Sequence, residues 1–212
     1  MREPMTGSME AAPLPPWARA AWALALCVVL ALHLSHARVM SGRHRWWHLG
    51  HTAMAAGMVS MYALPRMGHE QLYRAGLVVF ALLTLALLSA VLLLRRRDGG
   101  LDPLWVFSAA DMLVMTCMLL PPARLAPVVE GVLVAYLAVQ TVAWALGLWE
   151  RVPAFRAVAR ASVFATGART APAGGVPGVG GAAAVPTAHS VVAVRLTLAV
   201  MSAGMAFMLA AM

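Results

Sequence analysis

The sequence contains little charge for its length. Only 11% of its 212 residues are charged and 62% are hydrophobic, whereas soluble domains carry about 25% charged residues. A water-soluble fold of this size cannot bury so much apolar surface, so the composition excludes an ordinary soluble domain. We expect a lipid bilayer to be the main partner of the chain.

Lysine is absent, so all 16 basic residues are arginine, and the formal net charge is +8. In a soluble protein this charge would suggest nucleic acid as a ligand. Here the arginines lie between the long apolar segments, where they report membrane topology. We therefore expect no nucleic-acid partner.

Cysteine is scarce, and the two cysteines, Cys27 and Cys117, lie in separate apolar segments. They form no C-x-x-C pair and imply no disulfide framework. The sequence also lacks a Ser-His-Asp set, a phosphate-binding loop and an HExxH motif. We expect no enzymatic activity and no catalytic residues.

Six apolar segments of about 17–23 residues match the hydrocarbon thickness of a bilayer. They predict an all-α fold, a polytopic membrane bundle of six transmembrane helices. The predicted spans are Trp17–His36, Trp46–Leu64, Leu72–Leu94, Leu104–Leu120, Pro127–Trp149 and Ser190–Met212.

Four regions make up the expected organisation. We expect residues 1–16 to form a disordered tail, followed by a region of five spans at residues 17–150. Residues 190–212 add the sixth span to the same bundle. The segment 151–189 reads as a loop with an interfacial helix followed by a flexible Gly/Pro/Ala linker.

Arginine counts give the orientation. The first, third and fifth connections are rich in arginine, whereas the N-terminal tail and the other connections hold few. By the positive-inside rule the rich connections are cytoplasmic, and both chain termini are extracytoplasmic. The spans then form three hairpins of a multi-pass protein, which we expect in the plasma membrane.

Methionine recurs at helical spacing in alternate spans. At about 100° per residue, each set shares one face of its helix. Thioethers are flexible packing groups, and they are also soft ligands suited to Cu(I). The candidate metal-ligating residues are His51, Met54, Met58 and Met61; Asp111, Met115 and Met118; and Met201, Met205 and Met208.

Asp111 lies about seven residues into the fourth span, roughly 10 Å deep. Arg195 and His51 lie at similar depths in spans that start on the same side. An unpaired charge at that depth would cost several kcal/mol, so we expect Asp111 to face the bundle interior. Its predicted partner is Arg195, in a buried ion pair, or alternatively His51. Such a pair would fix the helix register, relay protons, or serve a metal or substrate.

Histidines gather around the first connection, with His33 and His36 closing the first span and His48 and His51 opening the second. They could be interfacial side chains that reach toward water. Two of them on different helices could instead be axial ligands of a haem, or the group could bind a metal.

Three segments, HTAMAAGMVSMY, DMLVMTCML and RLTLAVMSAGMAFMLAAM, resemble an uncharacterised multi-pass membrane family of actinobacteria, a domain-of-unknown-function family with His and Met in its transmembrane helices. The resemblance implies no reaction. Asp111 stands where that family would lead us to expect histidine.

Three hypotheses follow. The first is soft-metal binding or transport, with copper as the expected metal, and it requires the methionine strips to face a common axis. The second is a non-enzymatic accessory or structural subunit of a membrane complex or homo-oligomer. The third is a haem-containing redox protein.

Overall fold

The computed structural model describes residues 14–64, 66, 68–98, 102–121, 126–152 and 188–211. These residues are all helical or in short connections, which confirms the all-α prediction. Six α-helices and one short 3-10 helix are present in this part of the chain. They are α1 (Pro16–Val39), α2 (Arg43–Ala63), α3 (Glu70–Asp98), α4 (Pro103–Leu119), α5 (Pro127–Ala145), η2 (Leu148–Arg151) and α7 (Ala188–Ala210).

Proline defines where three helices begin. Pro16, Pro103 and Pro127 occupy the first turns of α1, α4 and α5, where their missing N–H groups have no helical partner in any case. The carboxylate of Asp102 also accepts a hydrogen bond from the backbone N–H of Leu104 at 3.0 Å, which caps α4.

The fifth helix ends earlier than predicted. The sequence suggested a span to Trp149, but α5 ends at Ala145 because Gly147 adopts a left-handed conformation with φ 65°. Glycine takes this conformation without steric cost and commonly ends helices. The chain then turns into η2, so Trp149 packs beside the end of α5 instead of continuing it.

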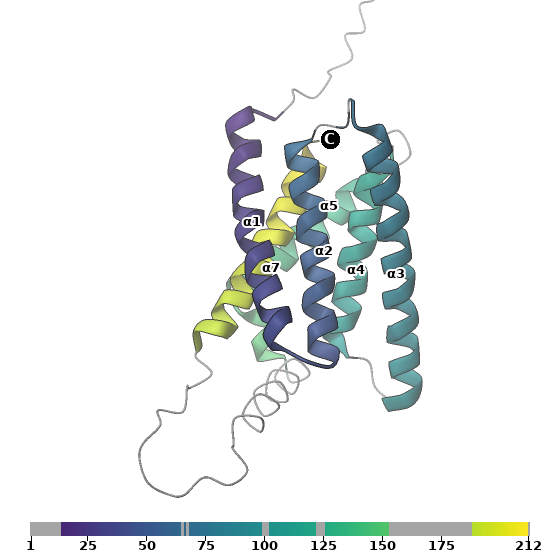
Figure 1. The fold of residues 1–212 in the computed structure, drawn as a ribbon, viewed down its shortest axis with the longest axis vertical. Coiled ribbons are helices and arrows are strands. Elements are labelled where there is room, and N and C mark those ends of the chain that lie inside the picture. Colours follow the sequence, from purple (N-terminus) through teal and green to yellow (C-terminus); the bar gives the residue numbers. More distant parts are fainter. Residues whose placement is uncertain are drawn as a thin grey trace, which may run out of the picture.

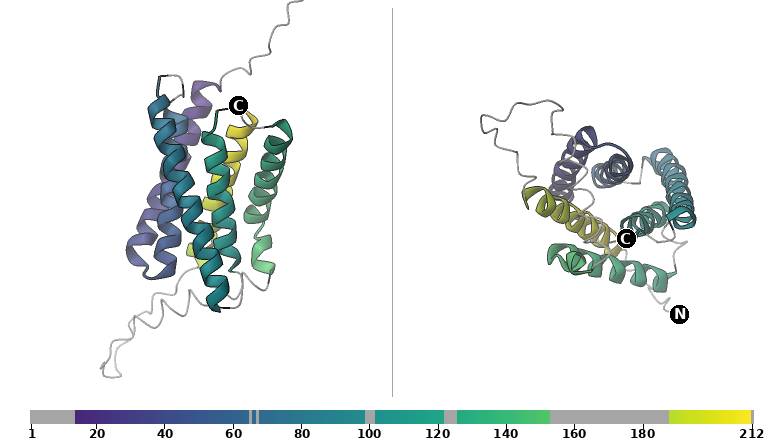
Figure 2. Two further views of the ribbon diagram at one scale, coloured as in Figure 1. Left: turned by 90° about the vertical axis from the view of Figure 1, so that its right-hand side faces the viewer. Right: turned by 90° about the horizontal axis from the view of Figure 1, so that it is seen from below.

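The helices form three hairpin pairs. α1 packs most extensively on α2, α3 on α4, and α5 on α7, while α2 also contacts α4 and α7 (Figure 1). Figure 2 shows the same pairs seen along the bundle. The start of α1 and the end of α7 lie at the same end of the bundle (Figure 1).

Four helices are long and apolar enough to cross a membrane: α1, α3, α5 and α7. α4 is apolar but has only 17 residues, and α2 carries several histidines and arginines. The prediction of six spans is therefore supported by composition for four helices, and the crossings by α2 and α4 stay predictions.

Two predictions concern parts of the chain outside the described residues. They are the disordered tail, of which residues 1–13 are not described, and the interfacial helix with its flexible linker, of which residues 153–187 are not described.

Candidate functional site

Methionines from three helices meet in the centre of the bundle. Seven of them are almost completely buried and belong to one hydrophobic cluster, which we call the methionine core. The structure thus brings together the strips of α2, α4 and α7, with Met61 and Met208 partly buried at the periphery. The methionine core consists of Met54, Met58, Met112, Met115, Met118, Met201 and Met205.

Glycines allow these thioethers to approach neighbouring backbones. A Cβ placed on Gly57 of α2 would lie 3.2 Å from Met115 Cε of α4, and one on Gly204 of α7 would lie 3.0 Å from Met58 Cε of α2. The methionine core is therefore an interlocked contact between α2 and its two neighbours. The same sulfur atoms provide soft ligands from three helices within one water-poor volume.

A second group of residues lies at the end of the bundle where α1 ends and α2 begins. We call His33, His36, His48 and His51 the histidine cluster; His33, His48 and His51 are 1%, 4% and 2% exposed. Nδ1 of His33 lies 3.0 Å from Nδ1 of His48. The His33 ring stacks on His51, and the His36 ring on His48, with centroid separations of 5.3 and 5.2 Å.

Hydrogen bonds to the backbone fix two of the tautomers. Nδ1–H of His36 donates to the carbonyl oxygen of Leu32 at 2.7 Å, and Nδ1–H of His51 donates to that of Trp47 at 3.0 Å. In the neutral form, Nε2 of each ring is then the nitrogen with a free lone pair. Nε2 of His33 is buried and has no hydrogen-bond partner, which costs about 1–3 kcal/mol.

The cluster does not offer a slot for a haem between its rings. His33 and His48 contact each other directly through Nδ1, and the other pairs stack face to face. A porphyrin would have to separate α1 from α2, which form the most extensive helix contact of the bundle. Among the described residues no group of three or more His, Cys, Asp or Glu side chains is arranged to hold a metal ion.

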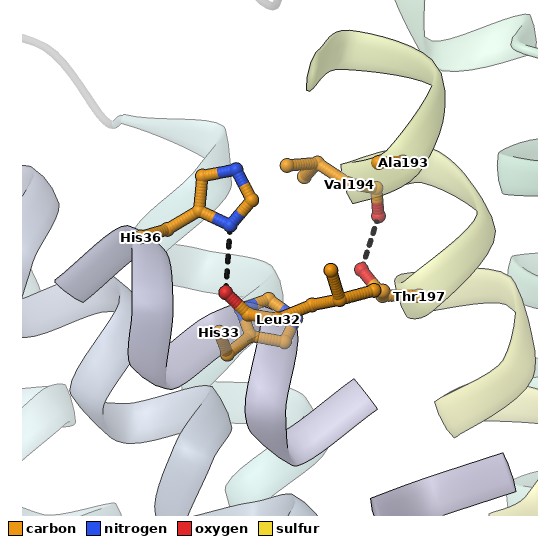
Figure 3. Close-up of a pocket in the computed structure, with 6 residues that line it drawn as sticks. All are labelled: Leu32, His33, His36, Ala193, Val194 and Thr197. Atoms are coloured by element: carbon orange, nitrogen blue, oxygen red, sulfur yellow. Dashed lines mark hydrogen bonds between the residues drawn. The ribbon is translucent and has the colours of Figure 1, made fainter. Parts of the chain in front are cut away.

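A crevice too narrow to admit a water molecule borders the histidine cluster between α1 and α7. His33, His36 and Leu32 form one wall, and Ala193, Val194 and Thr197 form the other (Figure 3). The hydroxyl of Thr197 donates to the carbonyl oxygen of Val194 at 2.7 Å (Figure 3), so this wall presents mainly apolar atoms.

Asp111 is buried, as predicted, but its partner is different. The hydroxyl of Tyr136 donates to Asp111 Oδ1 at 3.0 Å, and Nε2 of Gln140 donates to the Tyr136 hydroxyl at 2.9 Å. Nε1 of Trp149 donates to Oε1 of Gln140 at 3.2 Å. This hydrogen-bond chain joins α4 to α5 and continues to η2.

The predicted ion pair between Asp111 and Arg195 therefore needs correction. Arg195 donates from Nε to the carbonyl oxygen of Trp144 at 3.3 Å and from Nη2 to that of Ala145 at 3.0 Å. The last carbonyls of a helix lack partners within the helix and carry partial negative charge. The end of α5 thus binds the guanidinium, and His51, the alternative partner, binds the Trp47 carbonyl.

Sequence reasoning missed two contributors to these sites, Met112 and Tyr136. Met112 belongs to the methionine core, and the three-residue spacing of Met112, Met115 and Met118 was the signal. Tyr136 and Gln140, four residues apart on one face of α5, were the signal for the Asp111 chain.

Comparisons with protein-family models, with curated proteins and with solved structures each found no match.

Proposed function

We propose that this chain is a multi-pass protein of the plasma membrane that binds or transports a soft metal ion, with Cu(I) as the best match. The methionine core supplies the ligands. The proposal does not include an enzymatic reaction. The proposal assigns no ligand role to Asp111, whose carboxylate accepts a hydrogen bond from Tyr136.

One observation carries this proposal. The methionine core places seven thioethers, from three helices that are distant in sequence, in one buried cluster. Sulfur ligands select Cu(I) over hard cations such as Mg²⁺ or Ca²⁺. Many weak thioether sites in a row would hold an ion loosely enough to pass it along the bundle. His51, one turn before Met54 on the same buried face of α2, adds an imidazole at one end.

The test is a Cu(I) titration of the full chain, purified in mild detergent under reducing conditions and in competition with a chromophoric Cu(I) chelator. We expect the wild type to bind Cu(I) and a Met54→Leu/Met58→Leu double variant to bind it at least about tenfold more weakly. Leucine is close in volume to methionine, so each change should cost under about 1.5 kcal/mol in stability.

Met40→Leu is the matched control, because Met40 caps the end of α1 outside the methionine core. Its affinity should equal that of the wild type. A wild-type protein that leaves all Cu(I) on the chelator would contradict the proposal, and so would a double variant with unchanged affinity.

The packing itself favours a second candidate, an accessory subunit of a membrane complex. The thioethers of Met58 and Met115 lie close against glycine backbones, as expected for methionine used as a packing group. In that case the double variant would change neither metal content nor function. A defined protein partner, or a second copy of the chain, would co-purify in native mass spectrometry.

A further inference from the structure

We propose that His33 and His48 form a separate site for a monovalent soft ion of the Cu(I) class, bound between their two Nδ1 atoms. This inference extends the proposed function, because it places a second ligand set for the same ion at the α1–α2 end of the bundle. The sequence suggested a haem or a metal for the histidine group as a whole, without singling out this pair or the Nδ1 atoms as ligands.

The distance between the two nitrogens is only slightly shorter than the distance that an ion bound between them would require. The Nδ1 atoms lie 3.0 Å apart. Metal–imidazole bonds of about 2.0 Å place two nitrogens on opposite sides of one ion about 4 Å apart. The rings must therefore separate by about 1 Å. His33 lies in the second-to-last turn of α1 and His48 in the second turn of α2, and neither side chain belongs to the methionine core.

The surroundings select a two-coordinate ion. Zn²⁺ and other divalent ions in proteins take four or more ligands, and no three-donor group is present in the part of the chain that the structure describes. Cu(I) binds two imidazoles in a linear arrangement. A single positive charge is also less costly than a double charge at a site where the imidazoles are 1% and 4% exposed.

Binding requires a tautomer change but no net loss of protons. In the neutral pair, one Nδ1–H donates to the other Nδ1. To coordinate an ion through both Nδ1 atoms, that imidazole moves its proton to Nε2. The ion replaces the shared hydrogen bond, and each ring keeps one proton.

The pair lies beside the histidine that precedes the methionine core on α2. His33 lines the crevice between α1 and α7, with His36 at its wall (Figure 3). The His33 ring stacks on His51, and Met54 follows three residues later on the same face of α2. An ion at His33 and His48 would therefore lie next to His51, one turn before the first thioether of the core.

The test uses His48→Asn in the full chain, in the same Cu(I) titration. The asparagine amide lies close to the position of imidazole Nδ1, so it keeps a hydrogen-bonding group beside His33 while it removes the soft nitrogen ligand. We expect the variant to lose one Cu(I) equivalent or to bind it at least about tenfold more weakly. X-ray absorption of the wild type should show nitrogen at about 2.0 Å, and this shell should decrease in His48→Asn.

His69→Asn is the matched control, because His69 lies in the connection between α2 and α3, at the other end of the bundle. Its Cu(I) stoichiometry should be that of the wild type. The thermal unfolding midpoint of each variant shows whether the fold is retained. If His48→Asn does not fold, His33→Gln replaces it, since it removes the other Nδ1 ligand.

The outcomes separate this inference from the proposed function. If only Met54→Leu/Met58→Leu loses Cu(I) while His48→Asn binds as the wild type does, the histidine site is wrong and the methionine site stands. If only His48→Asn loses Cu(I), the histidine site stands and the methionine core is a packing device. If the wild type binds no Cu(I), both proposals are wrong.

Discussion

Gly57 is a point of close approach between α2 and two neighbouring helices. A Cβ at this position would lie 2.6 Å from Cζ of Phe80 on α3 and 3.2 Å from Cε of Met115 on α4. Contacts below 3.0 Å require a shift of the neighbouring side chain, and Phe80 is itself buried. The absence of a side chain at Gly57 therefore sets how closely three helices pack.

We expect Gly57→Ala to lower stability by about 1–3 kcal/mol through overpacking, despite the better helix propensity of alanine. The thermal unfolding midpoint in detergent measures the effect. Gly131→Ala is the control, because a Cβ at Gly131 of α5 meets nothing within 4 Å. It should leave the midpoint unchanged or raise it. Equal midpoints for the two variants would mean that Gly57 has room for a methyl group.

At the same scale, Asp111 shows the limit of reasoning from sequence position. Its burial followed from its depth in an apolar segment. Its partner did not, because depth places residues in a layer without giving their directions around the helix axis. Tyr136 of α5 faces Asp111, whereas Arg195 of α7 faces the end of α5. The Tyr136 hydroxyl donates a hydrogen bond to the carboxyl group where the sequence predicted an ion pair.

Among the helices, arginine serves repeatedly as a cap for a neighbouring helix. Arg19 of α1 donates from Nε and Nη2 to the carbonyl oxygen of Tyr62, at 3.0 and 2.9 Å, at the end of α2. Arg66 donates to the carbonyls of Leu119 and Leu120 at the end of α4. Arg195 does the same at the end of α5. The planar guanidinium can reach two acceptors, or one through two donors, which the lysine ammonium does less well.

We expect Arg19→Met to loosen the end of α2, because hydrogen bonds from a charged group are worth about 1.5–3 kcal/mol. Amide hydrogen exchange in the last turn of α2 should become faster, and exchange in α5 should not change. Arg74→Met provides the comparison, since Arg74 forms only an exposed pair with Glu70 at 3.4 Å. Similar exchange in both variants would show that the Arg19 bonds do not hold α2.

Helix periodicity predicted the elements better than their ends or their side-chain partners. The methionine spacing in α2, α4 and α7 predicted faces that meet, and Met54, Met115 and Met201 are buried together. The end of α5 was wrong by four residues because Gly147 could equally have continued an apolar helix. The stacking within the histidine cluster depends on how α1 and α2 pair, which single-helix patterns do not contain.

At the scale of the whole molecule, the open question is how many helices cross the bilayer. α2 and α4 contribute five of the seven methionines of the methionine core and contact each other inside the bundle, with α1 packed on α2 and α3 packed on α4. A helix surrounded by other helices does not need an apolar outer face. The polar composition of α2, which keeps it out of the set of apolar candidates, is therefore compatible with a membrane crossing.

Cysteine accessibility distinguishes six crossings from four. Val39, at the end of α1, is 83% exposed, and Gln71, in the first turn of α3, is also exposed. In a background with Cys27→Ala and Cys117→Ala, we introduce either Val39→Cys or Gln71→Cys and treat intact cells with a membrane-impermeant maleimide.

If α2 crosses the bilayer, the two positions lie on opposite sides. The arginine-rich first connection places Val39 inside, so Gln71→Cys should react in intact cells and Val39→Cys only after lysis. The reverse pattern would keep the crossing and invert the orientation. Equal reaction of both variants before lysis, or of neither, would mean that α2 returns to the side on which it began, and the methionine core could not then line a path through the membrane.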